Sequence, residues 1–297
     1  MNTNEAKTPM RIDLHMHTNI SDGELTPELL MLRANQMQLD YIAITDHDAV
    51  SATTLARQAK TQYSLKSPEV ISGIEVSCRW HTFEIHVLGW NFDESHAAME
   101  ALVLEQQNKR AERARKIAEK LVKAGVKAEH LPTSSSDIDI SSPRVLTRPH
   151  FADALVRHGY VKTHEQAFKQ YLTKGARAYV PTAWTSIEDA VAVIKQAGGT
   201  TGLAHPLAYK MSSKWLRRLI QEFKAVGGDA LEVVSCQQTK EQRAWLQELA
   251  DTYQLPVSVG SDFHRPGPWR ELGRNLQLPE NATPVWSSWN ITQRHVE

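Results

Sequence analysis

The sequence has little cysteine, no net charge and no long apolar run, and each of these absences excludes a class of protein. Its two cysteines, Cys78 and Cys236, lie far apart without a CxxC pair, so a disulfide framework and a thiolate zinc site are both excluded. The 34 basic residues equal the 34 acidic ones, which argues against binding long nucleic acid or membrane surfaces by bulk charge. No run of about 18 apolar residues occurs, so we expect no membrane contact.

The remaining composition is that of an ordinary globular protein. Apolar residues make up 41% of the 297-residue chain, which is enough for one large core. The first nine residues, MNTNEAKTP, lack the apolar segment of a signal peptide, so we expect a cytoplasmic protein. Nothing in the composition indicates an obligate protein partner.

Strand-like and helix-like segments alternate along most of the chain. Seven short apolar runs are bounded by polar residues, as expected for buried strands, and helical patterns separate most of them. The strands after the one that begins near Arg11 are predicted at 41–45, 70–76, 83–90, 200–204, 230–234 and 256–259. This order favours an α/β barrel or doubly wound sheet of parallel strands covered by helices.

A different pattern interrupts this alternation. A long helix is predicted from Ser95 to about Lys127, a serine-rich polar stretch follows, and two more helices are predicted at 149–157 and 165–173. We therefore expect a first barrel part at 10–95, a helical insertion or lid at 96–182, and a second barrel part at 183–297. Residues 105–127 carry eight basic and three acidic side chains, which favours a solvated helix face over a nucleic-acid contact.

Histidines and carboxylates gather at or near the ends of the predicted strands. In RIDLHMHTNISDG, the alternation of side chains points His15 and His17 to one side, and turn residues place Asp22 nearby. The other members of the set are His47, Glu75, His86, His205, Asp262 and His264. Because strand ends meet at one face of a parallel α/β barrel, we expect all nine side chains to converge.

Such a cluster requires cations, because burying imidazoles and carboxylates without partners is unfavourable. For His86 alone, a structural place in the core is an equally good interpretation. Mixed nitrogen and oxygen ligands suit Mn²⁺, Fe²⁺ or Zn²⁺. Nine ligands exceed the need of one ion, so we predict two or three divalent ions with Glu75 as the bridging carboxylate. Such ions activate water and bind phosphoryl oxygens, so the predicted chemistry is hydrolysis of phosphate esters.

Six motifs carry a family resemblance. In chain order, DLHMHT, ITDHD, GIEVS, IHVLGW, LAHP and GSDFH resemble those of the polymerase and histidinol phosphatase (PHP) family of metal-dependent phosphoesterases. The resemblance implies a distorted seven-stranded β/α barrel and a trinuclear site, usually with manganese. The implied ligand sets are His15, His17, Glu75 and Asp262 for one ion, Glu75, His86 and His205 for a second, and Asp22, His47 and His264 for a third.

The helical insertion and the segment PRVLTRPH at 143–150 resemble the branch of this family that acts on nucleotides. The resemblance implies removal of the 3′-phosphate from nucleoside 3′,5′-bisphosphates, such as adenosine 3′,5′-bisphosphate, or 5′-to-3′ trimming of short 5′-phosphorylated RNA, by attack of a metal-bridged hydroxide. Arg148, His150 and, more weakly, Arg144 are candidate phosphate contacts, since guanidinium groups match phosphate oxygens. Trp269 is a candidate for stacking on a base, with packing of its loop as the alternative.

The same predicted site indicates catalytic roles for three of its residues. Asp262 is predicted to orient the hydroxide, and His205 or His264 to protonate the leaving group, although all three are also predicted ligands. One alternative function is a histidinol-phosphate phosphatase, which the long insertion disfavours. Another is a non-catalytic nucleic-acid-binding module that uses the basic helix, which the complete ligand set disfavours.

Overall fold

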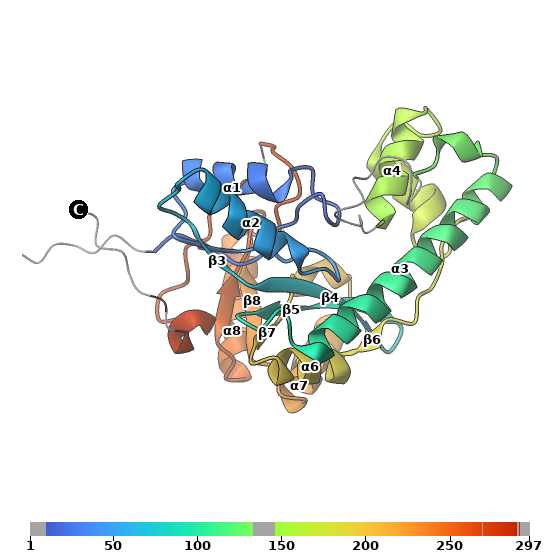
Figure 1. The fold of residues 1–297 in the computed structure, drawn as a ribbon. Coiled ribbons are helices and arrows are strands. Elements are labelled where there is room, and N and C mark those ends of the chain that lie inside the picture. The colour runs from blue at the N-terminus through green and yellow to red at the C-terminus, as the bar shows by residue number, and fades with distance from the viewer. Residues whose placement is uncertain (1–9, 133–145, 269, 290, 292–297) are drawn as a thin grey trace, which may run out of the picture.

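The structure, a computed structural model, describes residues 10–132, 146–268, 270–289 and 291 (Figure 1). Its strands form two sheets. β1 (Ile12–Asp13), β2 (Tyr41–Ala43) and β3 (Glu69–Ile71) make a small parallel sheet. The larger sheet has the strand order β6-β4-β5-β7-β8-β9. Its strands are β4 (Gly73–Trp80), β5 (Phe83–Trp90), β6 (Thr185–Ser186), β7 (Thr200–Leu203), β8 (Ala230–Val234) and β9 (Val257–Val259).

Backbone hydrogen bonds join the two sheets at two places. Just beyond β1, the N–H of Leu14 donates to the carbonyl of Val259 at 3.1 Å. Beyond β2, the N–H of Glu75 donates to the carbonyl of Asp46 at 3.2 Å. The chain segments that carry the predicted ligands are therefore held against one another by main-chain bonds.

One strand departs from the predicted parallel arrangement. β5 runs antiparallel to both β4 and β7, because only His81 and Thr82 separate it from β4 and no crossover helix intervenes. His86 therefore lies within β5, opposite Ser77 of β4, rather than beyond a strand end. The mixed α/β class is confirmed, and the prediction of parallel strands throughout was wrong at this strand.

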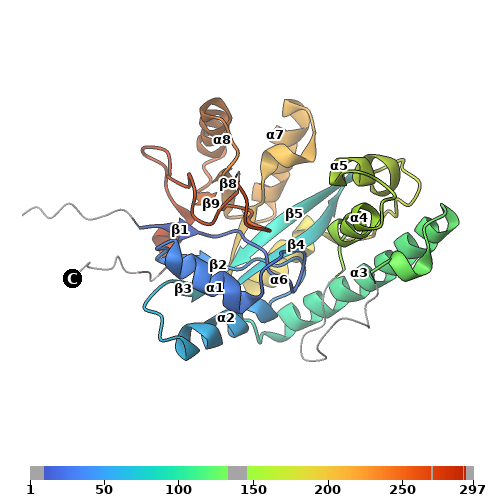
Figure 2. The same cartoon turned by 90° about the horizontal axis from the view of Figure 1, so that it is seen from above.

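Helices cover the sheets. Thr26 accepts the N–H of Leu29 at the start of the first helix, and Pro27 occupies its first turn. Figure 2 shows α7 and α8 on one side of the strands and α1 and α2 on the other. The α-helices are α1 (Pro27–Gln36), α2 (Ser51–Gln62), α3 (Ala97–Lys123), α4 (Arg148–Arg157), α5 (His164–Ala167), α6 (Ile187–Gln196), α7 (Ser213–Ala225) and α8 (Lys240–Thr252). Within the described ranges, no helix combines the length and the apolar character that a membrane span needs.

Residues between 96 and 182 build a core of their own. At its start, α3 packs Met99 and Leu102 into the large core of the sheet. Its second half joins Phe151 and Leu155 of α4 in a separate apolar cluster. Figure 1 shows α3 running out from the sheet to this small helical group. The helix expected at 165–173 is a short α-helix followed by a π-helical segment, Phe168–Leu172.

Candidate metal centre

Glu75 lies at the centre of the site and approaches five imidazoles. It comes from β4 and is fully buried. Its Oε1 lies 2.9 Å from both His86 Nδ1 and His205 Nε2, and its Oε2 lies 2.9 Å from His47 Nδ1. The other two imidazoles approach at 3.4 and 3.3 Å and belong to His15 and His17. This central position is the one expected of a bridging carboxylate.

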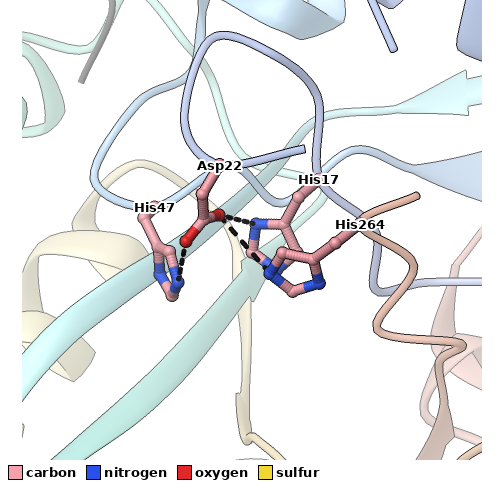
Figure 3. Close-up of side chains that lie close together, drawn as sticks. All are labelled: His17, Asp22, His47 and His264. Carbon is pink, nitrogen blue, oxygen red and sulfur yellow. Dashed lines mark ion pairs between the residues drawn. The ribbon is translucent and has the colours of Figure 1, made fainter. Parts of the chain in front are cut away.

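A second group surrounds Asp22, as Figure 3 shows. Asp22 Oδ1 lies 3.4 Å from His264 Nε2 and 3.7 Å from His17 Nδ1. Asp22 Oδ2 lies 3.7 Å from His47 Nε2. The ligand atoms of all four residues lie within 4.8 Å of one another. The predicted set of Asp22, His47 and His264 therefore comes together, with His17 as an additional neighbour.

Asp262 adjoins the other side of the histidine pair. Its Oδ1 lies 3.6 Å from Nε2 of both His15 and His17, and its Oδ2 lies 2.7 Å from Nη1 of Arg270. The backbone φ angle is 51° at Asp262 and 25° at His205, values that residues other than glycine rarely adopt. Strain of this kind persists where the surrounding structure holds a residue for its function.

All nine side chains predicted as ligands converge, and the atoms at their centre fit a cation. Glu75 Oε2 and His47 Nδ1 are 2.9 Å apart, yet neither has a hydrogen-bond partner within the described chain. Buried polar atoms are normally paired. An imidazole nitrogen and a carboxylate oxygen without hydrogen bonds can both donate lone pairs to one ion, so the donor set fits divalent metals.

Neighbouring charges and burial have opposite effects on the pKa values of this cluster. Burial lowers the pKa of His17, but hydrogen bonds to Asp262 and Glu75 and the charges of Glu75 and Asp22 raise it to about 10. At His47 burial dominates and lowers the pKa to about 4. Burial would raise the pKa of Glu75, but the charges of His86 and His47 hold it well below its usual value. The carboxylates favour protonated imidazoles, and bound divalent ions would replace these protons.

Glu232 of β8 supports two of these histidines and is a site residue that the sequence pattern did not reveal. Its Oε1 lies 2.9 Å from His15 Nδ1, and its Oε2 accepts the backbone N–H of His205 at 2.6 Å. A Cβ at Gly260 would lie 2.2 Å from His15 Cβ and 2.5 Å from Glu232 Oε1, so only glycine fits there. The sequence does carry one signal for Glu232. It is a carboxylate inside the apolar run ALEVV, just as His86 is an imidazole inside the apolar run FEIHVLGW.

Asp46 fixes the loop that carries Asp22. Its carboxylate accepts the N–H of Thr18 at 2.8 Å and the hydroxyl of Ser21 at 2.5 Å, and all three residues are buried. The turn after β1 is thereby folded over the cluster, as its turn residues predicted.

A cavity of about 240 Å³ opens beside the cluster. Seven of the nine predicted ligands line it, together with arginine and aromatic side chains that we call the arginine wall. These side chains are Arg110, Arg113, Arg148, Phe168 and Trp184. The guanidinium groups of Arg110 and Arg113 lie 5.0 and 5.3 Å from the ring of Trp184, in cation–π contact.

Arg110 and Arg113 depart from the solvated helix face that was predicted for α3. They are only 5% and 8% exposed. Burial lowers the pKa of Arg113 to about 10, and the charges of Arg148 and Arg110 add to this effect. The helical spacing of the two arginines indicates that they are buried, because they share one face of the helix with Gln106 and Ile117.

Other basic residues of α3 do lie on a solvated face. Arg115 and Lys116 pair with Glu112 of the same helix, at 2.7 and 3.0 Å, and all three are about half exposed. The solvated-face interpretation is therefore correct for these residues.

The predicted substrate contacts have different surroundings. Arg148 lines the cavity, with its Nη2 3.1 Å from Glu84 Oε2. His150 is buried, its Nδ1 accepts the N–H of Thr147 at the start of α4, and it is not among the cavity-lining residues. Its role in phosphate binding stays a prediction. Arg144 and Trp269 lie outside the described residues.

Comparison with known proteins identifies the family. The PHP domain model matches residues 13–172. The 5′-3′ exoribonuclease Rnm of Salmonella typhimurium is 43% identical over 282 residues, which cover 95% of this chain and 94% of that protein. The 3′,5′-nucleoside bisphosphate phosphatase of Chromobacterium violaceum is 36% identical over 276 residues, covering 93% and 95%.

A solved structure agrees with the sequence comparisons. An amidohydrolase from Chromobacterium violaceum, solved with bound sulfate and without metal, superposes with a TM-score of 0.83 at 35% identity. The match covers 93% of this chain and 94% of that one. With its nine-residue ligand cluster, the chain belongs to the PHP domain family and is a metal-dependent phosphoester hydrolase.

Proposed function

We propose that this chain hydrolyses nucleotide phosphate esters, trimming short 5′-phosphorylated RNA in the 5′-to-3′ direction and removing the 3′-phosphate of nucleoside 3′,5′-bisphosphates. The observation that carries the proposal is one cavity with seven predicted metal ligands on one wall and three arginines on another. The similar proteins from Salmonella and Chromobacterium are named for these two activities. Both substrates carry a second phosphate close to the ester that is cut.

The nine clustered residues would hold two or three divalent ions, with Mn²⁺ expected and Fe²⁺ or Zn²⁺ as alternatives. We assign His15, His17, Glu75 and Asp262 to one ion, Glu75, His86 and His205 to a second, and Asp22, His47 and His264 to a third. The distances from Glu75 to His86 and His205 support the second set, and the distance from Asp22 to His264 supports the third. When bound, such ions polarise the phosphoryl oxygens and lower the pKa of the attacking water.

Three of the residues have proposed catalytic roles as well. Asp262 orients the attacking water, which the fixed contacts of its two oxygens with His15 and Arg270 support. His205 or His264 delivers a proton to the leaving oxygen. Their side chains are 19% and 24% exposed and both line the cavity, so either can reach an ester bound there.

The arginine wall would bind the phosphate that is not cut. Arg148 and Arg113 come from different helices and point into the same cavity as the cluster. Arginine provides paired donors in the geometry of phosphate oxygens. A volume of about 240 Å³ lies below the usual range for a whole ligand. The cavity therefore suits the phosphorylated end of a nucleic acid, with the remainder outside.

We also propose that the fold is a barrel with an insertion. Seven of the nine strands described in the two sheets would form one distorted β/α barrel, which the bonds from Leu14 to Val259 and from Glu75 to Asp46 support. Residues 96–182 would be an insertion that contributes the arginine wall, which the separate core around Phe151 supports.

The decisive experiment is product mapping with the purified protein in Mn²⁺. We expect adenosine 3′,5′-bisphosphate to yield adenosine 5′-monophosphate and phosphate, and a 5′-phosphorylated RNA oligomer to release 5′-mononucleotides from its 5′ end. Histidinol phosphate should be a poor substrate. Faster hydrolysis of histidinol phosphate would replace the proposal by the histidinol-phosphate phosphatase alternative. Binding of RNA without cleavage of either nucleotide substrate would favour the non-catalytic alternative.

A further inference from the structure

Glu84 places a carboxylate among the arginines of the cavity. It lies in β5, lines the cavity, and its side chain is 22% exposed. Its Oε1 lies 3.1 Å from Nη2 of Arg113, and its Oε2 lies 3.1 Å from Nη2 of Arg148. One carboxylate thereby joins guanidinium groups from two different helices.

The third arginine of this wall is paired differently. Arg110 binds Asp48 Oδ2 at 2.6 Å and Ser77 Oγ at 2.5 Å. Asp48 is fully buried and also accepts the N–H of Ser77 and the amide of Gln106, so it is a fixed structural partner. Within the described chain, the carboxylate of Glu84 has no hydrogen-bond or ion-pair partner except Arg113 and Arg148. Glu84 is thus the partner that an incoming anion can displace.

The chemistry of the two arginines determines which anions succeed. A carboxylate has two oxygens and one negative charge. An internal phosphodiester also has two free oxygens and one charge, so its exchange with Glu84 brings no gain in charge or in acceptor atoms. A terminal phosphate monoester carries a charge of about −1.5 to −2 and three acceptor oxygens. Its exchange with Glu84 therefore strengthens the bonds to Arg113 and Arg148.

We propose that Glu84 is an internal competitor for the site between Arg113 and Arg148. It weakens the binding of every anion there by the same factor, so that a terminal phosphate still binds well and a phosphodiester, which gains nothing by the exchange, binds only weakly. This inference rests on the proposed function, since it concerns the phosphate that is not cut. It accounts for recognition of a phosphorylated end by charge, without requiring the cavity to enclose the rest of the substrate.

The test compares two substrates that differ only in this phosphate. One is adenosine 3′,5′-bisphosphate, and the other carries a methyl ester on its 5′-phosphate, which removes one charge and one acceptor. We expect the wild-type holoenzyme to favour the free phosphate in kcat/KM. Glu84→Gln keeps the shape but removes the charge. Because every anion must displace the same carboxylate, KM should fall about tenfold for both substrates, the size expected of one bond to a charged group. The preference for the free phosphate should be retained, since it comes from the third oxygen and the extra charge of that group.

Two further variants complete the test. Glu94→Gln is the matched control, because Glu94 pairs with Arg57 at 2.5 Å and is 19% exposed, but does not line the cavity. Its KM values should equal those of the wild type. Glu84→Ala removes the same charge and should also lower KM for both substrates, which keeps the test valid if glutamine itself bridges the arginines.

A KM that is unchanged or higher for both substrates in both Glu84 variants would mean that Glu84 only braces the arginines. Calorimetric binding of adenosine 5′-monophosphate and its methyl ester provides a readout without hydrolysis, with the same expected gain in affinity for both. A wild-type protein that hydrolyses neither substrate would refute the proposed function, whereas the measured affinities would still decide the role of Glu84.

Discussion

Oε2 of Glu75 and Nδ1 of His47 lie 2.9 Å apart, both buried, and neither atom has a hydrogen-bond partner within the described chain. A proton shared between them would satisfy both atoms, but their geometry does not form that bond. Two buried lone-pair donors that lie side by side without hydrogen bonds fit a metal centre, where they can bind the same ion or two neighbouring ions.

Glu75 is the first residue to change. Glu75→Gln keeps the volume of the side chain but removes the charge that faces five imidazoles. Loss of a bridging ligand should lower kcat about a thousandfold, since ligand-held ions supply several kcal/mol of transition-state stabilisation. Metal analysis should show at least one ion fewer per chain. Wild-type activity together with a full metal content in this variant would contradict the assignment.

Glu232 should act on the metals through His15. It accepts from His15 Nδ1 and from the N–H of His205, and the amide of Glu232→Gln can accept from only one of them with its single oxygen. We expect metal affinity to fall about 10- to 100-fold. Asp229→Asn is the control, because Asp229 precedes the same strand but bonds to Thr201 and Lys195, away from the cluster. Equal metal affinities in both variants would exclude a positioning role for Glu232.

Gly260 and Gly267 form a matched pair of glycines in the segment after β9. An alanine Cβ at Gly260 would meet His15 and Glu232, whereas a Cβ at Gly267 would meet nothing within 4 Å. Gly260→Ala should therefore displace His15 and remove most of the activity, while Gly267→Ala should behave as the wild type. Activity and metal content measured side by side decide this. A Gly260→Ala protein with normal metal content would show that the contact relaxes without moving the ligand.

Asp48 should contribute to stability rather than to metal binding. Asp48→Asn leaves the charge of Arg110 buried without its partner, which should lower the free energy of unfolding by about 3 kcal/mol. The backbone of Asp48, with a φ of 52°, is one that asparagine tolerates, so the substitution isolates the charge. Urea unfolding of the metal-loaded protein measures the effect, with the exposed Asp251→Asn as control. A loss no larger than that of the control would show that the pair contributes little.

The nine residues of the cluster could be singled out because each carries a signal in its own segment. His15 and His17 alternate with apolar residues, and Glu75 and Asp262 follow or end apolar runs. The convergence of segments more than two hundred residues apart followed from the rule that ligands gather at strand ends. The antiparallel direction of β5 was missed, because a buried apolar run has the same pattern in either direction.

The arginine wall could not be predicted with the same ease. Arg110 and Arg113 belong to a helix rich in basic residues, and composition alone does not distinguish the buried from the solvated ones. Their partners, Asp48 and Glu84, lie in other elements and carry no local motif. Pairing of this kind depends on how α3 crosses the sheet, which is a property of the tertiary packing.

The number of divalent ions bound per chain is the most direct test of the central claim. Elemental analysis of the purified wild-type protein, combined with the hydrolysis rate as metal is removed by a chelator and restored, measures it. We expect two or three ions per chain, complete loss of hydrolysis on removal, and recovery with Mn²⁺. A protein that hydrolyses its nucleotide substrate at the full rate with fewer than two ions per chain would contradict the account.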